Sequence, residues 1–191
     1  MKKFIFLVLI FLMLAACNNV EENTEMQEKE STDITEETDT VTSEEEEEKP
    51  TYQIGETAAI TSDLYEFDYE VTVNDFQLTR EVDEVPIEDY LIGAREEDRF
   101  AVVDVTIKNI SDEAYVPNQM FSANFSAIDE NGGDISDDEF FTGGDEELAP
   151  GEELTGHLVY LTDINYADTF VLKYELMSDQ ETHFELPNPE Q

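Results

Sequence analysis

Apolar and polar side chains alternate one by one in long stretches of the chain after residue 50, and this period of two restricts the fold strongly. From Phe67 to Val73 the odd positions hold Phe, Tyr, Val and Val, and the even positions hold Asp, Glu and Thr. Successive side chains of a β-strand point to opposite faces, whereas an amphipathic helix repeats about every 3.6 residues. The segment is therefore predicted to be a strand with one face in a core and the other in water.

The same pattern recurs often enough to predict an all-β protein. Further strands are predicted at residues 52–60, 100–108, 121–127, 154–161, 170–176 and 182–186. The apolar positions change phase near Asn74-Asp75, which predicts a bulge, and Asn131-Gly132-Gly133 predicts a turn. Residues 86–94 carry apolar side chains at helical spacing and predict one short helix. Seven or eight short strands joined by turns predict an antiparallel β-sandwich.

The chain begins with a short apolar segment that ends at its only cysteine. Met1-Lys2-Lys3 precedes an apolar run from Phe4 to Leu14, which is shorter than the roughly 20 residues needed to span a bilayer. The next residues complete the sequence Leu14-Ala15-Ala16-Cys17, which resembles the lipobox of bacterial lipoproteins. By this resemblance, residues 1–16 are a signal peptide and Cys17 carries a diacylglycerol on its sulfur. The alternative is an ordinary secretory signal followed by a cysteine without a role.

A polar segment, residues 17–50, separates the signal peptide from the predicted domain at residues 51–188. It includes five consecutive glutamates at 44–48 and is otherwise rich in Thr, Asp, Ser and Asn. Such a composition cannot bury enough apolar surface to offset its conformational entropy. The segment is predicted to be a disordered linker, and an acidic tail that collects cations is the alternative.

The excess of acidic residues restricts the partners of the domain. The formal net charge of the chain is −40, and residues 50–191 contain 35 of its 49 acids and 5 of its 9 bases. Nucleic acids and anionic lipid headgroups are usually bound through Lys and Arg, so this domain would repel them. Cations and basic surfaces are the favoured partners. With a single cysteine the chain cannot form an intrachain disulfide or a zinc site of the Cys type.

Four segments of the predicted domain resemble, in order, a family of Ig-like domains of unknown function from Gram-positive surface lipoproteins. They are Tyr52–Thr57, Arg99–Asn109, Asp129–Gly132 and Leu148–Glu152. The family is also similar to a mycobacterial immunoprotective extracellular antigen. Because these segments are turns and core strands, the resemblance implies an Ig-like sandwich and a place on the cell surface, and it assigns no binding residues.

The residues needed for nucleophilic catalysis are scarce. A nucleophile requires an oriented base, and the chain has only two histidines, His157 and His183. The strand pattern predicts that His157 points to solvent and that His183 begins the last strand. Carboxylate pairs are too frequent in so acidic a domain to identify an acid–base site. The sequence therefore predicts a protein that is not an enzyme.

The loop after Asn131-Gly132-Gly133 holds the candidate site residues. Five side chains could offer oxygen ligands to Ca²⁺, which binds six to eight oxygens: Asp129, Asn131, Asp134, Asp137 and Asp138. Their spacing does not match an EF-hand, and a solvated hairpin loop is the alternative. Phe140 and Phe141 follow, and they are predicted either to contact a partner or to close the end of the sandwich.

Together these features predict a lipid-anchored protein on the extracytoplasmic face of the cell membrane. Its domain is expected to be a monomeric, non-catalytic binding or structural module of the cell envelope. Its expected partners are membrane lipid, through acylated Cys17, and an unidentified envelope protein or ligand. The alternative function is binding of Ca²⁺ or another cation by the acidic loop at 129–139. No other cofactor is expected.

Overall fold

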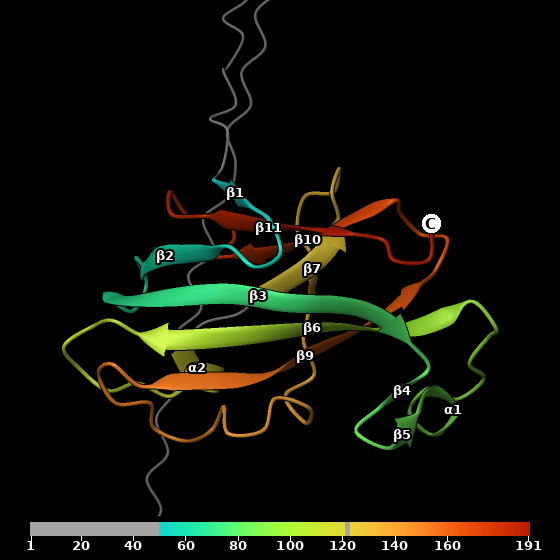
Figure 1. The fold of residues 1–191 in the computed structure, drawn as a ribbon, viewed down its shortest axis with the longest axis horizontal. Helices are drawn as coiled ribbons and strands as arrows, with labels where there is room; N and C mark the ends of the chain where they lie inside the picture. The colour runs from blue at the N-terminus through green and yellow to red at the C-terminus, as the bar shows by residue number, and fades with distance from the viewer. Residues whose placement is uncertain (1–49, 121–122) are drawn as a thin grey trace, which may run out of the picture. The chain divides into compact units, whose positions relative to one another are not determined.

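Two β-sheets face each other in the computed structural model, which describes residues 50–120 and 123–191 (Figure 1). The predictions for the signal peptide, for Cys17 and for most of the linker lie outside the described residues. The four-stranded sheet has the order β2-β3-β6-β9. Its members are β2 (Thr57–Ser62), β3 (Phe67–Thr79), β6 (Asp98–Asn109) and β9 (Glu153–Asp163), all paired antiparallel.

The five-stranded sheet has the order β1-β11-β10-β7-β8. Its members are β1 (Thr51–Tyr52), β7 (Ala123–Ala127), β8 (Asp134–Ile135), β10 (Thr169–Tyr174) and β11 (Thr182–Pro187). The pairs are antiparallel except for β1, which lies parallel to β11. The predicted all-β, Ig-like sandwich is thus confirmed. The predicted strand at 52–60 is divided in the structure, because β1 ends at Tyr52 in this sheet and β2 begins at Thr57 in the other. β8 was not predicted, since its two residues are too few for alternation to be seen.

The predicted change of phase in β3 is a bulge in the structure. The register with β6 shifts between Val73 and Asp75, so that Val73 pairs with Val105 and Asp75 pairs with Asp104. One extra residue in a strand moves all later side chains to the other face. Before the bulge the odd positions are buried, and after it Phe76 and Leu78 are buried. The bulge therefore keeps one apolar face on the core along the whole strand.

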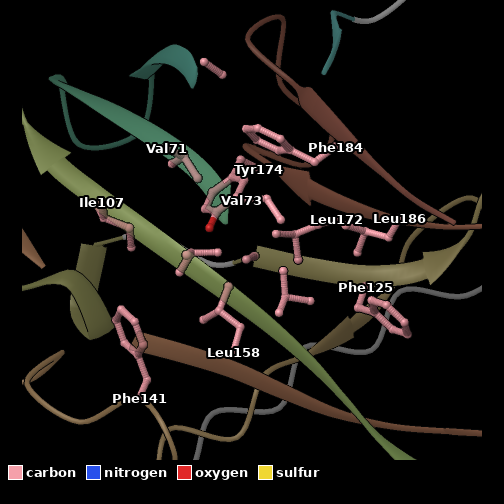
Figure 2. Close-up of a cluster of buried hydrophobic side chains, with 14 of the residues drawn as sticks. Val71, Val73, Ile107, Phe125, Phe141, Leu158, Leu172, Tyr174, Phe184 and Leu186 are labelled. Carbon is pink, nitrogen blue, oxygen red and sulfur yellow. The ribbon is translucent and has the colours of Figure 1, made fainter. Parts of the chain in front are cut away.

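The core lies between the two sheets, and both contribute alternating residues to it. In Figure 2, Val71, Val73 and Leu158 of the four-stranded sheet point toward Leu172 and Tyr174 of the five-stranded sheet. These side chains are at most 2% exposed. Phe125 packs nearly parallel to the rings of Tyr160 and Phe170, with centroid distances of 4.9 Å to each. The aromatic contacts across the sandwich add to the free energy gained by burying apolar surface.

An insertion between β3 and β6 covers the outer face of the four-stranded sheet. It contains β4 (Glu81–Val82), β5 (Val85–Pro86) and the predicted short helix, α1 (Ile87–Tyr90). Figure 1 shows all three beyond the end of β3. A second apolar cluster forms beneath it: Val82, Ile87, Phe100, Val102, Phe140 and Val159. This explains why the first half of β6 is apolar on both faces. A second short helix, α2 (Pro117–Met120), precedes β7.

The register identifies the two ends of the sandwich. Thr51 pairs with His183, and Tyr174 pairs with both Thr182 and Ala123, so the chain enters at the end where β10 finishes and β11 and β7 begin. At the opposite end Thr169 pairs with Pro187, and Phe170 pairs with Ala127. We call this opposite end the distal end. No helix among residues 50–120 and 123–191 is long and apolar enough to cross a membrane.

A partly buried carboxylate, Glu175, lies beside tyrosine hydroxyls at the end where the chain enters. Its carboxylate accepts hydrogen bonds from Tyr69 Oη at 2.9 Å and from Ser62 Oγ at 3.2 Å. Burial raises the pKa of Glu175, and the two hydrogen bonds only partly oppose this effect. Because the folded-state pKa is raised, the protonated form of Glu175 favours folding at low pH. That contribution is lost as the pH rises through the folded-state pKa.

Substitution of Glu175 by glutamine is therefore expected to stabilise the domain at neutral pH. Glutamine keeps the size and the acceptor oxygen but has no charge to desolvate. The difference in Tm between Glu175→Gln and the wild type should be small near pH 4 and grow to a few degrees by pH 7. The control is Glu146→Gln at an exposed position. Its difference in Tm from the wild type should not increase between pH 4 and pH 7. A constant difference for Glu175→Gln across the range would refute the role of burial.

Candidate functional site

The acidic loop does not bring its predicted metal ligands together. Asp137 accepts hydrogen bonds from Tyr90 Oη and, at 2.9 Å, from the backbone nitrogen of Glu139. The hydrogen bond to Asp137 raises the pKa of Tyr90 to about 12. Asp134 lies in β8. In the part of the chain that the structure describes, no three His, Cys, Asp or Glu side chains are grouped closely enough to hold a metal ion. A calcium site at Asp129, Asn131, Asp134, Asp137 and Asp138 thus stays a prediction from the sequence.

The prediction that Phe140 and Phe141 form an exposed contact surface is wrong. Their side chains are only 4% and 3% exposed, respectively. Phe140 packs in the second cluster, with ring centroids 5.8 Å from Tyr90 and 5.9 Å from Phe100. Phe141 points into the main core (Figure 2). The alternative interpretation, in which the rings close the sandwich, fits Phe141 alone, because Phe140 packs in the separate cluster beneath the insertion.

A glycine in β9 makes room for the ring of Phe141. A Cβ atom at Gly156 would lie 2.7 Å from two ring atoms of Phe141, closer than van der Waals contact allows. Glycine is unfavourable in the middle of a strand unless another group approaches the backbone closely. Gly156 therefore marks the place where the ring packs; in the sequence it signals a close approach to the backbone but does not identify Phe141.

All five basic side chains of the domain are engaged within it. Arg80 Nη1 donates to the backbone oxygens of Arg95, Glu96 and Asp98, at 2.8, 3.2 and 3.1 Å respectively. Arg99 Nη1 donates to the backbone oxygens of Glu96 and Asp98. Arg95 pairs with Asp98 and Asp163, and Lys108 lies 3.8 Å from Glu70 and 3.7 Å from Glu153. Within the described residues, most of the acidic side chains thus have no basic side chain beside them.

Lys173 is the fifth base and is unusual because it is only 3% exposed. Its ammonium donates to the backbone oxygens of Glu130 and Gly132, the latter at 2.9 Å. Burial lowers the pKa of Lys173, while Glu181 and Glu130 partly oppose this effect. Lys173 therefore fixes the turn that follows β7. The alternating pattern of β10 gave no sign that this lysine is buried.

Both histidines are bound to carboxylates. His157 Nδ1 lies within hydrogen-bonding distance of Asp104 in the neighbouring strand, and His183 Nε2 lies 2.6 Å from Glu181. His157 is 39% exposed, in keeping with its predicted position on the outer face of β9. His157 is thereby tied to the neighbouring strand and His183 to the residue two positions before it, and among the described residues neither imidazole is hydrogen-bonded to a Ser, Thr or Cys side chain.

A groove of about 550 Å³ lies near the distal end, between the edges of the two sheets. We call it the distal groove. Its lining residues come from two separate parts of the chain: Phe125, Ser126, Glu130, Asn131, Gly133 and Asp134 from the first, and Leu161, Thr162, Asp163 and Tyr166 from the second. A second hollow of about 470 Å³ shares Asp134 and Leu161 with it and adds Ile135. Ligand-binding clefts are commonly about 300–1,000 Å³, so either volume suffices for a ligand.

Among the described residues, a single backbone hydrogen bond links the segment that follows β8 to β9, and the distal groove lies beside it. The backbone nitrogen of Asp137, just after β8, donates to the oxygen of Val159 in β9 at 3.0 Å. In an antiparallel pair the N–H and C=O of one residue point to the same side, and this side alternates along the strand. Val159 and Leu161 therefore both direct their backbone groups away from β6. Leu161 lies in the groove, and its outward N–H and C=O have no hydrogen-bond partner among the described residues.

The lining of the groove is both acidic and apolar. Tyr166 Oη donates to Glu130, and this bond together with the nearby charges of Glu130 and Asp134 raises the pKa of Tyr166. Asp163 is partly neutralised by Arg95 at 3.2 Å. Three apolar side chains are exposed around these groups: Leu161 by 37%, Tyr166 by 55% and Ile135 by 69%. The site can therefore bind a group that is cationic and partly apolar.

Sequence reasoning found only a small part of this groove. It singled out Asn131 and Asp134, although as metal ligands, and missed Leu161, Asp163 and Tyr166. These residues are about 30 positions away, and only the pairing of β7 with β8 and the position of β9 bring them close. An exposed tyrosine in the turn after β9 was the available signal.

The family described as "Domain of unknown function (DUF4352)" matches residues 52–182. No curated protein matches the chain. Among solved structures, a "putative lipoprotein (ycdA)" from Bacillus subtilis is 14% identical to this chain, with a TM-score of 0.45. The match covers 68% of this chain and 38% of the Bacillus protein. A β-sandwich protein from Clostridium difficile is 18% identical with a TM-score of 0.44, covering 73% and 97%. The secreted protein MPT63 of Mycobacterium tuberculosis is 13% identical with a TM-score of 0.45, covering 73% and 99%.

Proposed function

This chain belongs to the DUF4352 family, as the resemblance in its turns and core strands predicted, and we propose that it is a lipid-anchored, non-catalytic binding module on the outer face of a bacterial cell membrane. The binding site in this proposal is the distal groove. The anchor is a lipid on Cys17, and residues 17–50 are the spacer between anchor and domain. One observation carries the proposal: a concave, partly apolar site with an unpaired strand edge lies near the end opposite the place where the chain enters the sandwich.

The anchor is supported by the first seventeen residues. Two lysines, a short apolar run and Leu14-Ala15-Ala16-Cys17 are the parts of a lipoprotein signal, and their order is the expected one. Two or more acyl chains on one terminus hold a protein on a bilayer far longer than one chain does. A flexible spacer of this length spans roughly 30 Å, and repulsion between its acids extends it further. The domain would then stand clear of the headgroups, with the distal groove open to partners.

The non-catalytic character is supported by the surroundings of the groove and of the histidines. The groove contains carboxylates, hydroxyls and an amide, and both imidazoles are paired with carboxylates away from it. Catalysis by an activated Ser or Cys usually relies on a neighbouring His or Lys, and the groove lining contains no His, Cys or Lys side chain. Its residues are suited to recognition.

Photocrosslinking in intact cells tests the proposed site. Ile135, which is 69% exposed beside the groove, is replaced by p-benzoylphenylalanine, and Ile110, which is 41% exposed at the end where the chain enters, is the matched control. Irradiation is expected to give a discrete adduct from position 135 and none of that mass from position 110. Adducts at both positions, or at neither, would contradict a binding site at the distal groove.

A further inference from the structure

Resting on the proposed function, we propose that the distal groove binds an extended, cationic peptide segment that lies along the edge of β9 at Leu161. The segment adds one short strand beside β9 and places a Lys or Arg side chain against Glu130 and Asp134. Three independent features of the groove lead to this occupant: its free backbone groups, its apolar rim and its charge.

The backbone of β9 is the first feature. A sheet edge with unpaired N–H and C=O groups pairs readily with another extended chain. Leu161 offers one donor and one acceptor on the same side of the strand, which is the arrangement that an antiparallel partner residue completes with two hydrogen bonds. Farther back along the strand, the oxygen of Val159 already accepts from Asp137. The free groups of Leu161 are therefore separated, by the bonded oxygen of Val159, from the earlier part of the strand edge.

The apolar rim is the second feature. Leu161, Tyr166 and Ile135 surround the groove and are between 37% and 69% exposed, although the surface nearby is strongly acidic. Exposed apolar side chains that gather around a concavity are typical of interaction sites. In an added strand, alternate side chains would face this rim while the others face water. A small inorganic cation would leave the rim uncovered, whereas a peptide would cover it.

The charge is the third feature, and it also distinguishes a foreign peptide from a second copy of the chain. Among the described residues, Asp134 makes no ion pair or side-chain hydrogen bond, and the carboxylate of Glu130 accepts hydrogen bonds only from a tyrosine hydroxyl and a backbone nitrogen. Two domains, each with 35 acids and 5 bases, would repel each other at this edge. A Lys or Arg side chain would instead be attracted by both carboxylates and could contact the ring of Tyr166.

A peptide titration tests the proposal on the full chain in detergent micelles at 150 mM NaCl. The probe is acetyl-Lys-Val-Lys-Val-Lys-Trp-amide, whose tryptophan can be excited selectively because the protein has none. Saturable binding is expected. Glu130→Gln with Asp134→Asn should raise Kd about tenfold. The matched control, Glu146→Gln with Glu147→Gln, removes the same charge at the opposite end and should change Kd less than about twofold.

A second peptide separates strand addition from general attraction to an acidic protein. The same sequence with N-methyl groups on both valines keeps its charge but loses two backbone donors, and it should bind about tenfold more weakly. Equal binding of the two peptides, or an equal loss in the control variant, would overturn the proposal. If Ile135 captures an adduct in cells while the peptide does not bind saturably, the groove remains a binding site and the cationic peptide is the wrong occupant.

Discussion

Replacing Phe141 with alanine is expected to lower the free energy of unfolding by about 3–5 kcal/mol. The ring is 3% exposed, packs in the main core, and fills the space that Gly156 leaves in β9. Truncation would remove its apolar contacts and leave a cavity that backbone on two sides keeps from collapsing. Urea unfolding followed by circular dichroism measures the change.

The neighbouring residue gives the matched control. Thr142 is exposed, and Thr142→Ala should change the stability by less than about 0.5 kcal/mol. Phe141→Leu keeps part of the volume and should fall between the two. If Phe141→Ala were as mild as Thr142→Ala, the ring would lie on the surface, as a contact residue would, and the packing described around Gly156 would be wrong.

Replacing Cys17 with serine is expected to abolish attachment of lipid. Diacylglycerol is carried on a thiol sulfur, and Cys17 is the only cysteine of the chain. Cells of the native host grown with an alkyne-labelled fatty acid should label the wild-type protein and leave Cys17→Ser unlabelled. The label measures acylation directly, so it does not depend on whether the signal peptide is removed from the variant.

Asn18→Ser is the control for Cys17→Ser. It changes the adjacent residue to the same amino acid, keeps the thiol, and should label as the wild type does. Labelling of Cys17→Ser, or a wild-type protein without label, would contradict the lipoprotein interpretation and leave an ordinary secreted protein.

The fold could be predicted from the sequence because each long strand carries its own signal. Alternation in β3 is local, and even its bulge is visible as a change of phase at Asn74-Asp75. The end of β10 was harder to predict. Leu176 continues the alternation, yet the strand ends at Tyr174, because Glu175 adopts a positive φ of 50° and turns the chain away. A pattern of hydrophobicity does not record such a turn at a non-glycine residue.

The candidate site was much less predictable, for two physical reasons. Phe140 and Phe141 follow an acidic loop, and only the tertiary structure shows that one packs beneath the insertion and the other against Gly156. The distal groove depends on the edges of two different sheets, and an edge is defined by the absence of a neighbouring strand. Local sequence could show that Asp134 and Leu161 exist but could not show that they share a concave site.

Amide hydrogen exchange along β9, measured by NMR with and without the Lys-Val peptide, tests the central claim most directly. In the free protein the amide of Leu161 should exchange fast, whereas those of Tyr160 and Thr162, which face β6, should be protected. The unmodified peptide at saturation should slow amide exchange at Leu161. The N-methylated peptide, added at the same concentration, should leave it unchanged. A Leu161 amide that is already protected in the free protein, or that the peptide leaves unchanged, would contradict the groove as a site of strand addition.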